Sequence, residues 1–286
     1  MRVEKAWSSA VSGIFTLVCL VGVLEVAAHD VPRLYSAIDN EPLTGNADFI
    51  KSGSGTLWLT APSNNTFSGD IRIERSGGAL ELGGNTFYAD GEGRAGIALP
   101  AMTSASTVTV NPGGALVIKD NANGAVGHLS NRLGSAGDRP ALVLNNGSFT
   151  YLGPSAAGVV TQSFDAITAA SGLSAITVTR NNAASTTILQ GGSFTRDSGS
   201  HLTLSATAMG TAADNVSQIL FTTPPQMVGG GVGIIPGVRH GNNFVTYGDY
   251  GLRALLAEEY FETSDINNAG PDDNVKVSAG TFVPLD

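Results

Sequence analysis

The chain has 286 residues, a formal net charge of −9, only 14% charged residues and 37 glycines. Its acidic balance argues against a nucleic-acid partner, because binding to phosphates depends on Lys and Arg. Low charge with many glycines favours strands and tight turns over surface helices, and a hydrophobic fraction of 42% can supply a core.

Residues 1–28 have the pattern of a signal peptide. Arg2 and Lys5 precede an apolar run at 14–24, and small residues precede an expected cleavage between Ala28 and His29. The apolar run is shorter than the ~20 residues that cross a bilayer, so we expect no stable membrane span in the mature chain. A buried strand or an uncleaved anchor is the alternative. The sequence therefore predicts a secreted or cell-surface protein.

The only cysteine, Cys19, lies inside this apolar run. A mature chain that starts at His29 would contain no cysteine, and its stability would come from packing and backbone hydrogen bonds. Residues 29–48 are polar and contain Pro32 and Pro42, so we expect an irregular lead-in there.

Short alternating runs begin after this lead-in. In residues 56–60, 70–74 and 79–82 every second residue is apolar, which is the pattern of strands with one buried face, and Gly, Asn, Pro or Ser bounds each run. Similar runs follow along the chain, and their apolar positions give a set of residues expected in the core: Leu57, Leu59, Leu80, Leu82, Leu116, Ile118, Leu142 and Leu144.

The runs recur as units of strand, turn and strand. Residues 106–118 repeat the unit around an Asn-Pro-Gly-Gly turn, residues 142–152 repeat it around Asn-Asn-Gly, and shorter strands are expected at 175–179, 186–189, 193–195 and 202–204. Like positions recur at spacings of about 20 to 40 residues, which is typical of repeat proteins. We predict an all-β fold, a right-handed parallel β-helix over residues 49–226, with a β-sandwich as the alternative.

Several segments resemble a known bacterial family, the autotransporter-associated β-strand repeat. The resemblance lies in residues 53–60 (GSGTLWLT), 64–73 (NNTFSGDIRI) and 77–84 (GGALELGG). Four later segments resemble the stretch that separates one run of repeats from the next: 233–236 (GIIP), 244–247 (FVTY), 251–255 (GLRAL) and 273–277 (DNVKV).

The resemblance implies an exported surface protein. Residues 227–286 would then be a glycine-rich spacer followed by the start of further repeats, and we expect the chain to be part of a longer one. Residues 254–261 could instead form a short helix, because Ala, Leu and Glu favour helices.

Local motifs for chemistry are weak. Residues 91–96 match G-x-G-x-x-G, but Pro100 would interrupt the helix that a nucleotide site needs. Residues 265–270 begin like a calcium loop, yet Ala269 offers no oxygen ligand and Lys276 stands where the loop needs Glu. No G-x-S-x-G is present. Metal-ligand spacing is absent from the histidines, which are His29, His128, His201 and His240.

A polysaccharide-active β-helix enzyme is the alternative function. It would need two or more carboxylates on one exposed face. The candidates are Asp70, Glu74, Glu81 and Glu92, of which the first three are expected to point outward from strands. The pairs Glu258-Glu259 and Asp272-Asp273 are expected in solvated turns.

These observations favour a non-catalytic structural or adhesive protein. Its expected partners are surface glycans or other surface proteins, and no catalytic, cofactor-binding or metal-binding residue is predicted.

Overall fold

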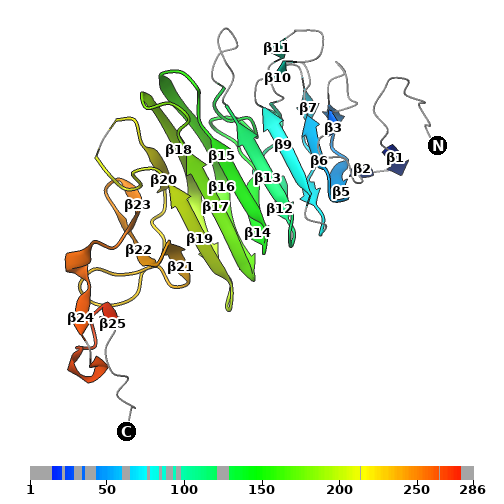
Figure 1. Cartoon of the computed structure of the whole chain (residues 1–286). Helices are drawn as coiled ribbons and strands as arrows, with labels where there is room; N and C mark the ends of the chain where they lie inside the picture. The colour runs from blue at the N-terminus through cyan, green and yellow to red at the C-terminus, as the bar shows by residue number, and fades with distance from the viewer. Residues whose placement is uncertain are drawn as a thin grey trace.

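The computed structural model describes residues 15–20, 23–28, 34–35, 43–59, 65–75, 78–83, 86–87, 93–94, 98–120, 129–212, 214–263 and 265–277. Within these ranges the chain is all-β, and its helical segments are two 3-10 turns, η1 (Ala257–Glu259) and η2 (Ile266–Asn268). The strands follow one another in chain order from the N-terminal to the C-terminal end of the molecule (Figure 1).

Two long sheets contain most of the strands. The nine-stranded sheet has, in spatial order, β1 (Phe15–Leu20), β2 (Val23–Ala28), β5 (Asp48–Ser52), β8 (Ile71–Ile73), β12 (Thr107–Val110), β14 (Ala141–Asn145), β16 (Gly158–Ser171), β18 (Ser185–Arg196) and β20 (Ser217–Phe221). The ten-stranded sheet has β23 (Gly251–Ala254), β22 (Asn243–Gly248), β21 (Val238–His240), β19 (His201–Ala206), β17 (Leu173–Thr179), β15 (Ser148–Leu152), β13 (Ala115–Lys119), β9 (Ala79–Gly83), β6 (Thr56–Leu59) and β3 (Leu34–Tyr35).

Apart from the short strands β7, β10 and β11, successive strands from β5 to β21 alternate between the two sheets, and neighbours within each sheet pair in parallel over this range. Antiparallel pairs in these sheets occur only at their ends, at β1–β2, β21–β22 and β22–β23. The prediction of an all-β chain with stacked parallel strands is confirmed. In the described part of residues 49–226, the antiparallel pairing of sequential strands is limited to the short strands β10 and β11.

Shorter pairs complete the described structure. They are β4 (Thr44–Gly45) with β7 (Thr66–Phe67), β10 (Thr86–Phe87) with β11 (Gly93–Arg94), and β24 (Phe261–Thr263) with β25 (Val275–Val277).

The parallel register stacks like side chains in columns along the core. One column of the nine-stranded sheet is Phe49, Ile71, Val108, Leu142, Ile167 and Phe194. One column of the ten-stranded sheet is Leu57, Leu80, Leu116, Phe149, Ile176 and Leu204. All eight side chains predicted in the core are at most 2% exposed, which confirms that prediction.

Tight turns join the two strands of each unit, and they also stack. The N–H of Ser148 donates to Gly114 O at 3.1 Å, and the N–H of Ala175 donates to Gly147 O at 3.1 Å. Gly147 has no room for a side chain, because a Cβ there would lie 2.6 Å from Val110 O. Asn146, with φ 55°, provides the left-handed residue of the same turn and accepts the N–H of Leu173 at 3.1 Å.

Several elements differ from the sequence predictions. β16 and β20 were not predicted, and the strands expected at 186–189 and 193–195 form one strand, β18. The lead-in contains β3 and β4, and residues 15–28 contain β1 and β2. Residues 254–261 form the end of β23, the 3-10 helix η1 and the start of β24, so the short helix considered there is limited to the three residues of η1. No helix in the described ranges is long and apolar enough to cross a membrane.

Candidate functional site

The structure places the candidate carboxylates on two different sheets. Asp70 and Glu74 flank β8 in the nine-stranded sheet, whereas Glu81 lies in β9 of the other sheet. Asp70 Oδ1 accepts the N–H of Thr107 at 2.7 Å, and Glu81 Oε1 lies 2.6 Å from the Nζ of Lys119. All three are half-buried beside buried neighbours, as expected for outward positions. Glu92 lies outside the described residues.

The remaining sequence motifs form no metal-ligand cluster in the described ranges. Asp265 Oδ1 accepts the N–H of Asn267 at 3.0 Å, so the segment resembling a calcium loop is an Asp-capped 3-10 turn. His201 and His240 lie on β19 and β21, while His29 and His128 lie outside the described residues. Most of the 91–96 motif is also outside them. No group of three potential metal ligands occurs in the part of the chain that the structure describes.

The β22–β23 hairpin covers the C-terminal end of the stacked strands. Val245 and Leu252 are 0% and 3% exposed, and the hairpin lies beside β20 in Figure 1. The hydroxyl of Tyr247 donates to Phe221 O and accepts the N–H of Phe221, both at 2.8 Å. The segments resembling F-V-T-Y and G-L-R-A-L therefore form a cap over the last strand of the nine-stranded sheet.

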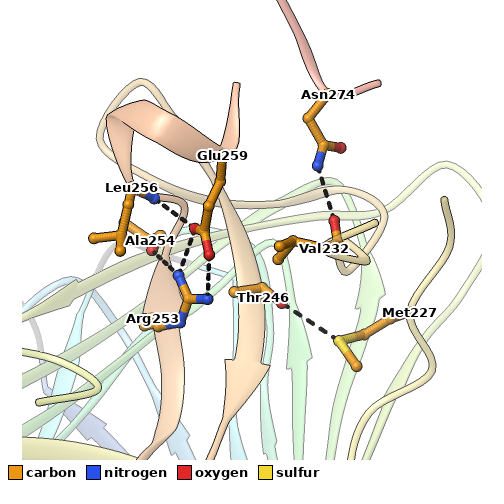
Figure 2. A network of polar contacts seen from close by, with 8 residues as sticks. All are labelled: Met227, Val232, Thr246, Arg253, Ala254, Leu256, Glu259 and Asn274. Atoms are coloured by element: carbon orange, nitrogen blue, oxygen red, sulfur yellow. Dashed lines mark hydrogen bonds and ion pairs between the residues drawn. The ribbon is translucent and has the colours of Figure 1, made fainter. Parts of the chain in front are cut away.

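A polar network fixes the chain after this hairpin (Figure 2). The guanidinium of Arg253 binds both carboxylate oxygens of Glu259 at 2.6 Å, and Glu259 also accepts the N–H of Leu256 at 2.7 Å. The hydrogen bonds from Arg253 hold the pKa of Glu259 below its usual value and raise the pKa of Arg253 itself. Glu259, with a side chain 13% exposed, is thus not the solvated turn residue that the sequence predicted, while Glu258 is exposed.

The same region holds the glycine-rich segment in place. Asn274 donates its amide to Val232 O at 2.8 Å, which joins the segment to the strand β25 (Figure 2). Val228 and Ile234 exchange backbone hydrogen bonds at 2.9 Å, so residues 228–234 form a small hairpin. Gly230 within it packs on Asp272, where a Cβ would lie 2.2 Å from the carboxyl carbon.

A cavity of about 290 Å³ lies between the end of β18 and this hairpin. One wall has Phe194, Thr195 and Arg196, and the other has Gln226, Val228, Ile235 and Pro236. Phe194 packs against Phe221, with ring centroids 5.6 Å apart, and this holds its ring in place. The lining combines apolar side chains with the guanidinium of Arg196 and the amide of Gln226, which suits the binding of a ligand that has an apolar part and an anionic group.

Sequence reasoning missed this site. Phe194 lies in the strand expected at 193–195 and Arg196 directly follows it, but a cavity forms beside them only because β20 is too short to cover them. The consecutive prolines, Pro224 and Pro225, were the available signal, since proline cannot donate to a strand ladder.

Comparisons with protein-family models, with curated proteins and with solved structures find no match to this chain.

Proposed function

We propose that the protein is an exported structural or adhesive protein of the bacterial cell surface, built as a right-handed parallel β-helix over residues 49–226. Residues 227–286 would cap this helix and lead into further repeats, as the resemblance to autotransporter passengers implies. The observation that supports the proposal best is the continuous parallel pairing from β5 to β21 with strands alternating between two sheets. In such a stack each additional repeat lengthens the molecule, so a short repeated unit produces an extended surface for binding partners.

The outer face of the nine-stranded sheet suits contact more than chemistry. Its side chains opposite the core include Thr109, Val143, Thr168 and Thr195 in register on four successive strands. The hydroxyls of Thr168 and Thr195 lie 2.9 Å apart and hydrogen-bond along the stack. Short, uncharged side chains on a regular face fit flat partners such as surface glycans or the sheets of other surface proteins.

Cleavage of polysaccharides receives less support from the geometry. A glycosidase needs two carboxylates roughly 5 to 10 Å apart around one bond. Here Asp70 and Glu81 belong to different sheets, and Glu81 is paired with Lys119 at 2.6 Å.

The proposal is tested by expressing the full chain in a bacterial host and asking where it resides and what it binds. We expect the protein to be accessible to added protease on intact cells, and Leu17→Asp in the apolar run to keep it in the cytosol. Purified protein should bind glycans or cell surfaces without turnover of acidic polysaccharides, with or without calcium. Turnover that disappears in Asp70→Asn or Glu81→Gln would contradict the proposal and favour an enzyme.

A further inference from the structure

The end of β18 is an open edge of the nine-stranded sheet. On one side β18 pairs with β16 along its length, from Ser185 opposite Gly158 to Arg196 opposite Ala169. On the other side β20 pairs only with residues 187–191. Residues 193–196 therefore have no strand on that side within the described part of the chain.

The reason is the sequence that follows β20. The N–H groups of Thr222 and Thr223 still donate to Gly191 O and Gly192 O, at 2.9 and 2.8 Å. The next two residues are Pro224 and Pro225, which have no N–H to continue the ladder. The chain turns away at this point, and the cavity of about 290 Å³ lies beside the strand it leaves uncovered.

The open edge presents backbone groups that can pair with another strand. The N–H of Asp197 donates to Ala169 O in β16 at 3.0 Å. Because N–H groups alternate in direction along a strand, those of Phe194 and Arg196 face the open side. The side chains of Phe194 and Arg196 extend the core columns of Ile167 and Ala169, so a residue placed over either of them would continue a column.

Arg196 gives the site its charge. Its Nη1 donates to Ser200 O at 2.7 Å and to Asp197 O at 3.2 Å, which fixes the guanidinium at the cavity wall. Its Nε and Nη2 make no hydrogen bond, and no acidic side chain pairs with it, within the described residues. A carboxylate in the cavity would form a charge-assisted pair with these remaining donors.

The geometry points to a binding site for an extended peptide that adds a strand to residues 193–196 and places an acidic side chain against Arg196. Main-chain hydrogen bonds would supply affinity, and the positions over Phe194 and Arg196 would supply specificity for an apolar residue followed two positions later by an acidic one. The proposed partner is a peptide segment of another protein. This proposal does not depend on whether the protein is exported.

The probe is a blocked peptide of sequence Thr-Val-Thr-Glu-Thr, which matches this pattern. Binding to the full chain is measured by calorimetry up to millimolar concentrations, and hydrogen exchange of the amides of residues 193–196 is followed with and without peptide. We expect saturable binding, slower exchange of the Phe194 and Arg196 amides, and at least a tenfold loss of affinity in Arg196→Gln. Changing the peptide Glu to Gln should cause the same loss in the original protein and no further loss in Arg196→Gln.

The matched control is Arg180→Gln. Arg180 also donates to backbone carbonyls, those of Ala183 and Asn215, but it does not line the cavity. Affinity should be unchanged in this variant, and both variants should keep the circular dichroism spectrum and melting temperature of the original protein. Absence of peptide binding, binding without slower exchange at 193–196, or binding of galacturonic acid in place of the peptide would each overturn the proposal.

Discussion

Asp120 and Arg132 form an ion pair inside the protein, with Asp120 Oδ1 and Arg132 Nη2 2.9 Å apart and side chains 0% and 3% exposed. Asp120 directly follows β13, and its Oδ1 also accepts the N–H of Leu129 at 3.0 Å. Its own N–H donates to Leu152 O at 2.8 Å. The pair therefore joins the start of the connection between β13 and β14 to residues 129–132 of the same connection, and the N–H of Asp120 joins it to the neighbouring stacked unit.

Removing one partner of this pair should be costly. We expect Arg132→Met to lower the free energy of unfolding by about 3 to 5 kcal/mol, because it leaves a buried carboxylate without its countercharge. The measurement is urea unfolding followed by circular dichroism. The control is Arg72→Met, since Arg72 lies 4.0 Å from Glu74 with side chains 50% and 39% exposed. That exposed pair should contribute about 1 kcal/mol or less, and equal losses in the two variants would contradict the prediction.

Tyr151 lies in the core close to this ion pair, and its hydroxyl should not contribute to stability. The side chain is 1% exposed, and the hydroxyl has no hydrogen-bond partner among the described residues. Burial, followed by the negative charge of Asp120, raises the pKa of the phenol far above its usual value, so it stays neutral. Tyr151→Phe removes an unpaired polar group and should leave stability unchanged or raise it by about 1 kcal/mol. A loss of more than that in the same unfolding experiment would indicate a hydrogen bond that the hydroxyl makes in solution.

The core columns give a third prediction. Leu142 is 0% exposed between Val108 and Ile167, whereas Val143 is next to it in β14 and faces outward. We expect Leu142→Asp to destabilise the protein by several kcal/mol, on the order of 4 or more, because a charge would be buried between stacked strands. Val143→Asp should cost about 1 kcal/mol or less. Similar losses at the two positions would mean that the alternation of inward and outward residues is wrong.

The strands with regular apolar alternation were predictable from the sequence. Apolar residues occur at every second position between glycine-rich turns, for example at Leu80 and Leu82 in β9. This alternation places them all on the buried face, and the parallel pairing then sets Leu80 beside Leu116 and Leu82 beside Ile118 of the next unit. β16 was missed because residues 158–171 (GVVTQSFDAITAAS) contain small and polar residues at inward positions, among them the buried Gln162 and Ser163. Their burial depends on hydrogen bonds to other units, such as that from Gln162 to Leu133 O at 3.1 Å, which a local pattern cannot show.

The candidate site was less predictable than the fold. The cavity requires that β18 extend to Arg196 and that β20 stop at Phe221. It therefore depends on the difference in length between two paired strands, which a local sequence pattern does not show. The acidic residues suggested by the sequence, Asp70, Glu74 and Glu81, do point outward from their strands. That Asp70 and Glu81 belong to different sheets could be seen only from the pairing of the strands in three dimensions.

Lys51 gives a pH-dependent prediction. Its side chain is buried at the end of the column that contains Ile73, and its Nζ donates to Gly53 O at 2.5 Å. Desolvation by burial lowers the pKa of Lys51 to about 8. In the unfolded chain the pKa would be about 10.4, so between these values the unfolded state binds more protons and stability rises with pH. Below pH 8 both states are protonated, and the cost of burying the charge is constant.

We therefore expect Lys51→Met to be more stable than the original protein at pH 7, and this advantage to shrink as the pH rises from about 8 to about 10. Urea unfolding at several pH values measures it. Lys276, whose side chain is 54% exposed, provides the control, because Lys276→Met should keep the pH dependence of the original protein. An advantage of Lys51→Met that does not change with pH would show that the ammonium is not desolvated.

The last prediction concerns the N-terminus. In the structure β2 pairs with β5, with Leu24 opposite Phe49 and Val26 opposite Lys51, so β2 covers the first unit after the lead-in. The sequence pattern nevertheless predicts cleavage after Ala28. N-terminal sequencing of exported protein should then begin at or near His29, and Ala28→Asp, which removes the small residue at the cleavage site, should leave the longer chain uncleaved.

Cleavage would also change the environment of Lys51. Without β2, β5 becomes the terminal strand of its sheet; we expect the ammonium to be better hydrated there, and the pKa of Lys51 to move back from about 8 toward its usual value. The mature protein should therefore show a smaller rise in stability above pH 8 than uncleaved Ala28→Asp does. An intact chain that begins at Met1 and remains in the cytosol would contradict the export prediction, and β1 and β2 would then belong to the functional protein as the cover of its first unit.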